Sequence, residues 1–120
     1  MSVKTETRRA GDFVLSEANG NLSRDAVVIG AGVLVPGTVL GVVTASGEHV
    51  AFDPAAVDGS EVAVAVLHGH ADATAAAVPG VAYTRLTEVR DDMLVWPEGI
   101  AAPDKTAALL ALAGSHIVAR

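Results

Sequence analysis

Short apolar segments separated by glycine, proline and turn residues run along most of the chain and predict a mainly β fold. The apolar runs have the length of strands rather than helices, and several are rich in β-branched residues. The segments expected to form strands are residues 27–29, 38–44, 48–52, 61–68 and 80–87. The second and third, joined by Ser46-Gly47, are expected to form a hairpin. The run 61–68 (EVAVAVLH) is the most continuous and predicts a central buried strand.

Other parts of the pattern are less regular. Gly41 interrupts an apolar strand candidate, which indicates a bulge or the close approach of another backbone. Residues 69–78 are rich in alanine, and their hydrophobic pattern assigns them neither to a helix nor to a strand. Residues 88–92 predict a charged turn or a short helix, and the C-terminal tail is expected to end in a short apolar segment, residues 117–118.

One α-helix is expected near the C-terminus, beginning at Pro103. Proline suits the first helical position, and the charge of Asp104 suits the positive end of the helix dipole. Leu109 and Leu112 lie three residues apart and therefore share one face. Gly114 is a natural end of the helix. The fold class predicted is mainly β with one short C-terminal helix (α+β).

The first 26 residues are expected to form a flexible N-terminal arm, followed by a β-rich domain over residues 27–120. Residues 1–12 are polar and show no hydrophobic period. The rest of the arm contains a strong turn signal, Asn19-Gly20. An ordinary frayed terminus would explain the same pattern, so this alternative stays open at this point.

Composition and charge limit the classes of function. Hydrophobic residues make up 51% of the chain, yet only four side chains are aromatic, so the core is built from small residues. Such a chain can gain burial by association between subunits. The net charge of −6 argues against binding nucleic acid through its phosphates. The charge is uneven, because residues 1–24 carry +1 and residues 25–120 carry −7.

The chain contains no cysteine, which excludes disulfides, thiolate metal sites and cysteine nucleophiles. No apolar stretch reaches the length of a membrane span, and no secretory signal is visible. We therefore expect the protein to be synthesised in the cytoplasm and not to associate with a membrane.

Residues 27–33 (VVIGAGV) imitate the start of a dinucleotide-binding unit, with Asp53 about 20 residues after the second glycine. That motif needs a helix directly after the glycines, whose N-terminus holds the pyrophosphate. Here Val35 stands at the third glycine position, and Pro36-Gly37 falls where the helix should begin. We reject a nucleotide cofactor, and the sequence predicts no cofactor of any kind.

His68, His70 and Asp72 have the H-x-H-x-D spacing of some metal-dependent hydrolases. In an extended segment alternate residues share a face, so both imidazoles could reach one ion. Those enzymes usually continue with another histidine, and Ala73 stands there instead. Two solvated histidines explain the pattern more simply, and we predict no metal ligands and no catalytic residues. A small hydrolase using these three side chains remains the alternative function.

The single tryptophan, Trp96, precedes Pro97. Aromatic–proline bonds are candidates for the cis isomer, so a cis bond is one hypothesis for this position. The other is that Trp96 is simply the largest core residue and that the bond is trans.

Several motifs occur together in a characteristic order. They are GDFVLSEANGNLSRDAVVI, EHVAFDPAAVDGSE, EVAVAVLHGHADAT, VAYTRLTEV, MLVWPEGI and an alanine-rich helix with a short apolar tail. In this combination the chain resembles the lambda-type head decoration proteins, the protein D family of tailed phage heads. The resemblance covers about nine tenths of the sequence, and the first residues are its least similar part.

The resemblance implies a small β-barrel-like domain that forms homotrimers and is not an enzyme. Such trimers bind the major capsid protein at three-fold and quasi-three-fold sites, on the outer surface of the expanded head. They stabilise the virion against the pressure of its DNA and do not contact nucleic acid directly. The protein would be made in the cytoplasm of the host bacterium.

In this family an N-terminal segment binds the capsid by adding a strand to a sheet edge. Carried onto this sequence, the segment runs from Phe13 to about Ile29. The residues expected to bind the capsid are Phe13, Val14, Leu15, Ser16, Glu17, Ala18, Asn19 and Gly20. The family's W-P-E corresponds to Trp96, Pro97 and Glu98, where we expect fold support or subunit packing. A third possibility, a monomeric β-barrel that binds sugars or adaptor proteins, is disfavoured by the scarcity of aromatic residues.

Overall fold

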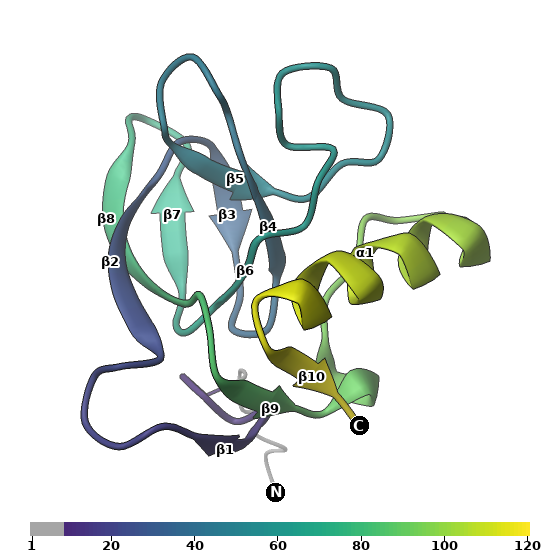
Figure 1. The fold of residues 1–120 in the computed structure, drawn as a ribbon. Coiled ribbons are helices and arrows are strands. Elements are labelled where there is room, and N and C mark those ends of the chain that lie inside the picture. Colours follow the sequence, from purple (N-terminus) through teal and green to yellow (C-terminus); the bar gives the residue numbers. More distant parts are fainter. Residues whose placement is uncertain (1–8) are drawn as a thin grey trace, which may run out of the picture.

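The computed structural model describes residues 9–120, which form ten short strands, one 3-10 helix and one α-helix (Figure 1). Five strands close into a barrel: β2 (Arg24–Ile29), β4 (Val39–Val42), β5 (His49–Ala51), β6 (Ala65–Leu67) and β8 (Val78–Tyr83). The other elements are β1 (Val14–Glu17), β3 (Gly32–Leu34), β7 (Ala71–Ala73), β9 (Thr87–Val89), η1 (Asp91–Met93), α1 (Ala102–Gly114) and β10 (Ile117–Ala119). The expected fold class, mainly β with one C-terminal helix and a small barrel, is confirmed.

The barrel has the order β2-β5-β4-β6-β8 and closes through the antiparallel pair β2–β8. The expected hairpin is present as β4 and β5. A five-stranded barrel is narrow, so its interior holds mainly small and branched side chains. The first hydrophobic cluster of the protein consists of barrel residues and of residues from β3 and β7. Its buried members are Ile29, Leu34, Leu40, Ala65, Leu67, Ala71, Ala73 and Ala82. Four of these eight buried residues are alanines, which suits a narrow space.

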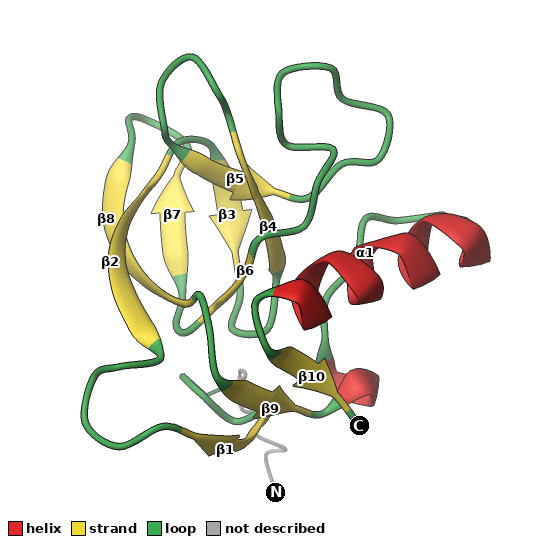
Figure 2. Ribbon diagram, viewed as in Figure 1, coloured by secondary structure: helices red, strands yellow, loops and turns green. Residues whose placement is uncertain are grey.

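A second core lies between the barrel, the helix and a three-stranded sheet of order β1-β9-β10 (Figure 2). In this sheet β1 runs antiparallel and β10 parallel to β9. The buried residues of this cluster are Phe13, Val39, Phe52, Ala63, Val66, Tyr83, Val89, Leu94, Ala108, Leu112 and Ile117. It joins segments from both ends of the described chain, so the sheet and the helix are held to the barrel as one body.

Strand β6 is buried on both faces, as expected for a central strand. Ala65 and Leu67 belong to the barrel interior, whereas Val66 belongs to the second core. The strand is shorter than the apolar run 61–68, whose first residues form a turn. Gly41 of β4 marks a close approach: a Cβ there would lie 2.6 Å from the Cα of Ser60. The register of β4 is continuous, so the position is not a bulge.

The helix agrees closely with its sequence signals. Pro103 lies in its first turn, and Leu112 is buried while Leu110 on the opposite side is 70% exposed. Gly114 is the last helical residue, after which His116 takes a positive φ of 60° and turns the chain into β10. None of the helices within residues 9–120 combines the length and apolar character needed to cross a bilayer.

The glycine pattern and the bond before Pro97 each carried a specific expectation. The last glycine of the pattern opens β3, which pairs with β7 and is followed by β4, so the helix that a dinucleotide site needs is not formed at this place. The hypothesis of a cis bond before Pro97 is wrong, because no peptide bond among the described residues is cis.

Candidate functional site

The segment expected to bind a capsid begins with a residue that is fully buried. Phe13 lies in the second core, where its ring meets the ring of Tyr83 edge to face with the centroids 5.7 Å apart. Val14, the next residue, pairs with Val89 across the β1–β9 ladder and packs against the same core. Phe13 therefore fixes the N-terminal segment to the body, and it offers no surface to a partner in this state.

Strand β1 is the outer strand of its sheet, so one of its edges is paired with no other strand of residues 9–120. The pairing advances two residues on β1, from Val14 to Ser16, against one on β9, so Leu15 is the extra residue of a bulge. The side chain of Leu15 is 52% exposed. Among the described residues, this end of the molecule thus presents an outer strand with an exposed leucine, and an outer strand edge is where another strand can be added.

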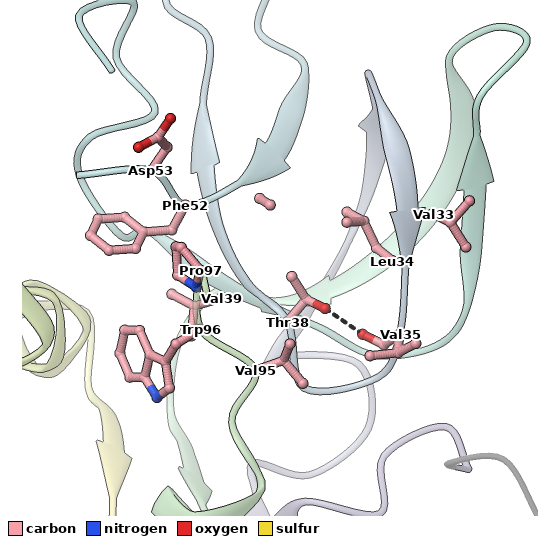
Figure 3. Close-up of a pocket in the computed structure, with 11 residues that line it drawn as sticks. Val33, Leu34, Val35, Thr38, Val39, Phe52, Asp53, Val95, Trp96 and Pro97 are labelled. Carbon is pink, nitrogen blue, oxygen red and sulfur yellow. Dashed lines mark hydrogen bonds between the residues drawn. The ribbon is translucent and has the colours of Figure 1, made fainter. Parts of the chain in front are cut away.

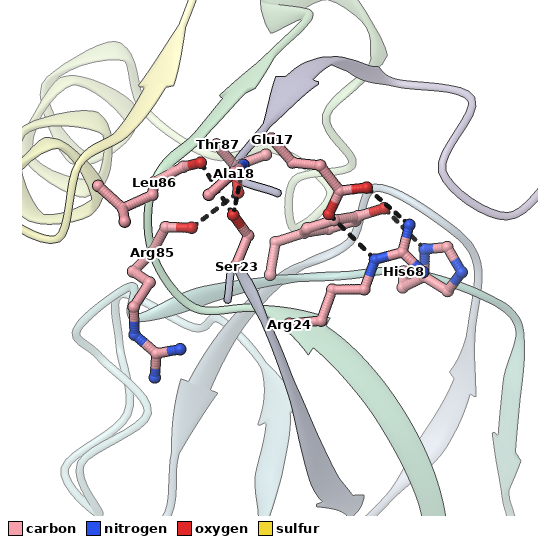
Figure 4. Close-up of polar contacts among 9 residues, drawn as sticks. Glu17, Ala18, Ser23, Arg24, His68, Arg85, Leu86 and Thr87 are labelled. Carbon is pink, nitrogen blue, oxygen red and sulfur yellow. Dashed lines mark hydrogen bonds and ion pairs between the residues drawn. The ribbon is translucent and has the colours of Figure 1, made fainter. Parts of the chain in front are cut away.

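An ion pair connects the end of β1 to the barrel. The carboxylate of Glu17 accepts hydrogen bonds from Nε and Nη2 of Arg24, at 3.0 and 2.7 Å (Figure 4). The guanidinium of Arg24 also lies over the ring of Tyr83, 5.5 Å from its centroid. The hydrogen bonds from Arg24 lower the pKa of the Glu17 carboxyl below its ordinary value. Arg24 therefore favours the charged form of Glu17, and the pair orients the Arg24 guanidinium over the Tyr83 ring.

The buried hydroxyl of Ser23 holds the turn between β1 and β2. Its Oγ accepts a hydrogen bond from the backbone N–H of Ala18 and donates one to the carbonyl of Leu86, both at 2.9 Å (Figure 4). The intervening turn contains exposed Asn19 and Gly20, and Gly20 has a φ of 65°. The turn predicted at Asn19-Gly20 is therefore confirmed.

The backbone before Phe13 is also attached to the barrel. The N–H of Gly11 donates to the carbonyl of His68 at 2.9 Å, and Nδ1 of His68 lies 2.9 Å from the hydroxyl of Tyr83. Burial, followed by the nearby charge of Arg24, lowers the pKa of His68. Burial raises the pKa of Tyr83. Both groups therefore favour their neutral forms. The hydrogen bond between them links the barrel residue that binds Gly11 to the ring on which Phe13 packs.

The outer face of the β1-β9-β10 sheet is polar at its centre. Glu88 accepts a hydrogen bond from the hydroxyl of Ser16 at 2.8 Å and pairs with the side chain of Arg120. These two partners, Ser16 first, lower the pKa of Glu88. A shallow hollow of about 410 Å³ lies on this side of the sheet. It is lined by Ser16, Glu17, Ala18, Leu86, Thr87, Glu88, His116 and Val118.

The structure places residues 13–26 in the folded body. The boundary expected after residue 26 falls inside β2, because that strand already begins at Arg24. The part of the expected arm that comprises residues 1–8 lies outside the described residues. The capsid-binding role of residues 13–20 is not decided by their position and stays a prediction.

Trp96 and its neighbours line a different part of the molecule (Figure 3). The Trp96 ring meets that of Phe52 edge to face at 6.2 Å, and Nζ of Lys105 lies 5.5 Å from its centroid. Trp96 and Pro97 line a mainly apolar hollow of about 400 Å³, while Glu98 is exposed in the following turn. Trp96 packs partly buried against the second core. Its role in subunit packing stays a prediction.

The alternative metal site gains no support from the geometry. Within residues 9–120, no three histidine, aspartate or glutamate side chains come together as a metal-binding group. His68 is engaged with Tyr83, and the Oδ1 of Asp72 accepts hydrogen bonds from the backbone N–H and the hydroxyl of Thr74.

Sequence reasoning did not find the partners of the N-terminal segment. Tyr83, Glu88 and Arg120 all lie far along the chain from β1, and nothing local connects them to it. One available signal was the alternation in residues 80–87, which predicted a strand that contains Tyr83.

The chain matches a known protein family over most of its length. The family model of the bacteriophage lambda head decoration protein D matches residues 3–117, nearly the whole chain. A search of curated proteins found no match. The family match includes the N-terminal segment, the barrel, the helix and the first residue of β10. The chain therefore belongs to the bacteriophage lambda head decoration protein D family.

Proposed function

We propose that this protein is a cementing protein of a phage head. It binds as homotrimers to the major capsid protein, at three-fold and quasi-three-fold sites on the outside of the expanded shell. There it stabilises the shell against the pressure of the packaged DNA. The observation that carries this proposal is the family match over residues 3–117. The proposed role is structural and involves no catalysis.

The end of the molecule that carries the β1-β9-β10 sheet is the side we assign to the shell. The described chain begins beside this sheet and ends on β10, so both ends lie on one side of the barrel (Figure 1). The free edge of β1 lies at the same end. A coat-protein strand that pairs with this edge would gain main-chain hydrogen bonds without special side chains.

Within the N-terminal segment the residues have different tasks in this proposal. Phe13 stays in the core and fixes the position of β1, because removing it from the core would expose a large apolar side chain. Leu15, Ser16 and the turn at Asn19-Gly20 are accessible and supply the contact. In this proposal residues 1–12 add to the contact with the shell. Three such segments in one trimer bind with an avidity above that of a single segment.

The direct test mixes the purified protein with expanded heads that lack a decoration protein, prepared from the phage that encodes it. Electron cryomicroscopy should show added density at the three-fold and quasi-three-fold sites. Decorated heads filled with DNA should also survive heating or chelation better than bare heads. Bare lattice after mixing at saturating protein would contradict the proposal.

Leu15→Asp tests the proposed contact, and Leu110→Asp is the matched control, because both leucines are exposed and only Leu15 lies on β1. We expect Leu15→Asp to weaken binding to heads at least about tenfold, as loss of a buried apolar anchor does, with Leu110→Asp unchanged. Removing residues 1–8 should weaken binding while leaving the fold intact. If Leu15→Asp and the protein without residues 1–8 bound heads as tightly as the wild type, another surface would contact the shell.

A further inference from the structure

An uncharged apolar surface lies on the outer wall of the barrel, where β2 pairs with β8. Its four residues face each other across the ladder: Ala26 opposite Val81, and Val28 opposite Pro79. All four are exposed, and Val28 and Val81 retain 46% and 38% of their accessible surface. We call these four residues the β2–β8 stripe. Adjacent exposed apolar residues on a small soluble protein often mark a contact surface.

The stripe is the uncovered half of a wall whose other half is covered by the N-terminal segment. Arg24 and Tyr83 continue the same face by alternation. They are covered there, because Phe13 packs on Tyr83 and Glu17 pairs with Arg24. No other part of residues 9–120 covers the rest of the face. A second polypeptide could therefore cover it as the N-terminal segment covers its neighbour.

The lack of charge on the stripe is the feature that suits a second copy of this acidic chain. Residues 25–120 carry −7, so two copies repel each other wherever their acidic surfaces face. The stripe has no charged side chain, and the charged groups at its lower end occur as neutral pairs. Arg24 pairs with Glu17, and Arg85 pairs with Asp25 at 2.6 Å. A second copy that docks on the stripe therefore meets only paired carboxylates at this end, while at the other end lies the carboxylate of Glu48, whose Oε1 would be 3.1 Å from a Cβ at Gly30.

The position of the stripe points the same way. The β2–β8 wall runs along the side of the barrel, away from the β1-β9-β10 end that we assign to the shell (Figure 1). A side wall is where neighbours around a three-fold axis normal to the shell would meet. The coat protein, by contrast, would meet the end.

We infer that the β2–β8 stripe is buried between neighbouring copies in the homotrimer. This inference rests on the proposed function for the existence of the trimer, and adds the surface through which its copies meet. Away from the three-fold axis itself, cyclic symmetry with three copies makes each stripe meet a different surface of the next copy. The small side chains of Ala26 and Pro79 leave room for that surface to approach the strands closely.

Single-cysteine labelling tests the inference without disturbing the contact, because the natural chain has no cysteine. Val28→Cys places a thiol in the stripe, and Val62→Cys is the control, since these valines are 46% and 51% exposed in the single chain. In the trimer we expect Val28→Cys to react with a thiol reagent at least about tenfold more slowly, as in a water-excluding interface centre. Both thiols should react at similar rates in denaturant. Equal rates in the native protein would overturn the inference.

A second pair of variants reads the oligomeric state directly by sedimentation, with circular dichroism as the check on folding. Val28→Asp should convert the trimer to folded single chains, whereas Val62→Asp should remain trimeric. A trimeric Val28→Asp, or dissociation by Val62→Asp instead, would overturn the inference, as would a wild-type protein that is monomeric. Head binding is scored separately. Decoration of heads by a trimer whose stripe is accessible refutes only the inference, whereas failure of the wild type to bind heads refutes the proposed function.

Discussion

The ring of Phe13 meets the ring of Tyr83 edge to face, with centroids 5.7 Å apart and ring planes at 86°. The two residues lie seventy positions apart, one before β1 and the other at the end of β8. Through this contact the N-terminal segment covers part of the barrel wall. The segment is thus part of the core as well as the candidate contact with the shell.

Replacing Phe13 by alanine should lower the free energy of unfolding by roughly 3 kcal/mol, since it removes a fully buried aromatic side chain and leaves a cavity. Urea unfolding followed by fluorescence or circular dichroism measures the change. The matched control is Leu15→Ala on the same segment. Because Leu15 is half exposed, its loss should change the free energy by only about 0.5 kcal/mol. Similar small effects for both would show that Phe13 is not part of the core in solution.

His68 should make the protein less stable as the pH falls through the range of histidine titration. Burial lowers its pKa in the folded state below the ordinary 6.5, so the unfolded chain takes up the proton first. The contribution to stability is therefore complete above about pH 6.5 and is lost as the pH falls from there toward the lower folded pKa. His49, whose pKa burial also lowers, adds a loss of the same sign.

The variant His68→Asn isolates this contribution, since it removes one titrating group and leaves His49 in place. Its free energy of unfolding should fall less than that of the wild type between about pH 7.5 and pH 5. Urea titrations at several pH values provide the comparison. A variant whose slope equals that of the wild type would mean that His68 titrates normally in the folded protein.

Gly41→Ala should be strongly destabilising, because its Cβ would lie 2.6 Å from the Cα of Ser60 and 2.5 Å from its carbonyl oxygen. These are backbone atoms, so the backbone segments at Gly41 and Ser60 must move apart. We expect a loss of about 3 kcal/mol, the upper part of the range for overpacking. Gly47→Ala is the comparison: nothing lies within 4 Å of its Cβ position, although its φ is 74°. It should cost only about 1 kcal/mol, for backbone strain. Thermal unfolding of both variants tests whether Gly41→Ala is the more destabilising of the two.

The ion pair between Glu17 and Arg24 should contribute little to stability despite its good geometry. About a quarter to a third of each side chain is accessible, so water and salt screen the charges. A double-mutant cycle with Glu17→Gln and Arg24→Met should give a coupling below about 1 kcal/mol, decreasing as salt is added. A larger coupling that does not change with salt would mean that the pair is shielded from solvent, for example inside an oligomer.

Features encoded over a few neighbouring residues were predictable. The start and end of α1 followed from Pro103 and Gly114, and the hairpin β4–β5 followed from two apolar runs around Ser46-Gly47. Each depends on backbone preferences that act within one turn of chain. The close approach at Gly41 was also foreseen, though not the residue that approaches.

Features that join distant residues were not predictable in the same way. The polar residues 1–12 and the turn signal at Asn19-Gly20 indicated a flexible arm, whereas Phe13 packs on Tyr83 and Ser16 bonds to Glu88. Short strands such as β7 and β9 were missed because three residues carry too little period to distinguish strand from loop. They become strands only because a partner chain segment lies beside them.

The order of apolar and turn residues by itself determined the mainly β class, the C-terminal helix and the resemblance to a capsid-decorating family. The tertiary structure alone decided that the N-terminal segment belongs to the core, that β1 becomes an outer strand, and that a bare stripe remains between β2 and β8. The reason is that burial depends on which surfaces meet after folding. A local pattern shows which side chains are apolar, but not which of them will find a partner within the same chain.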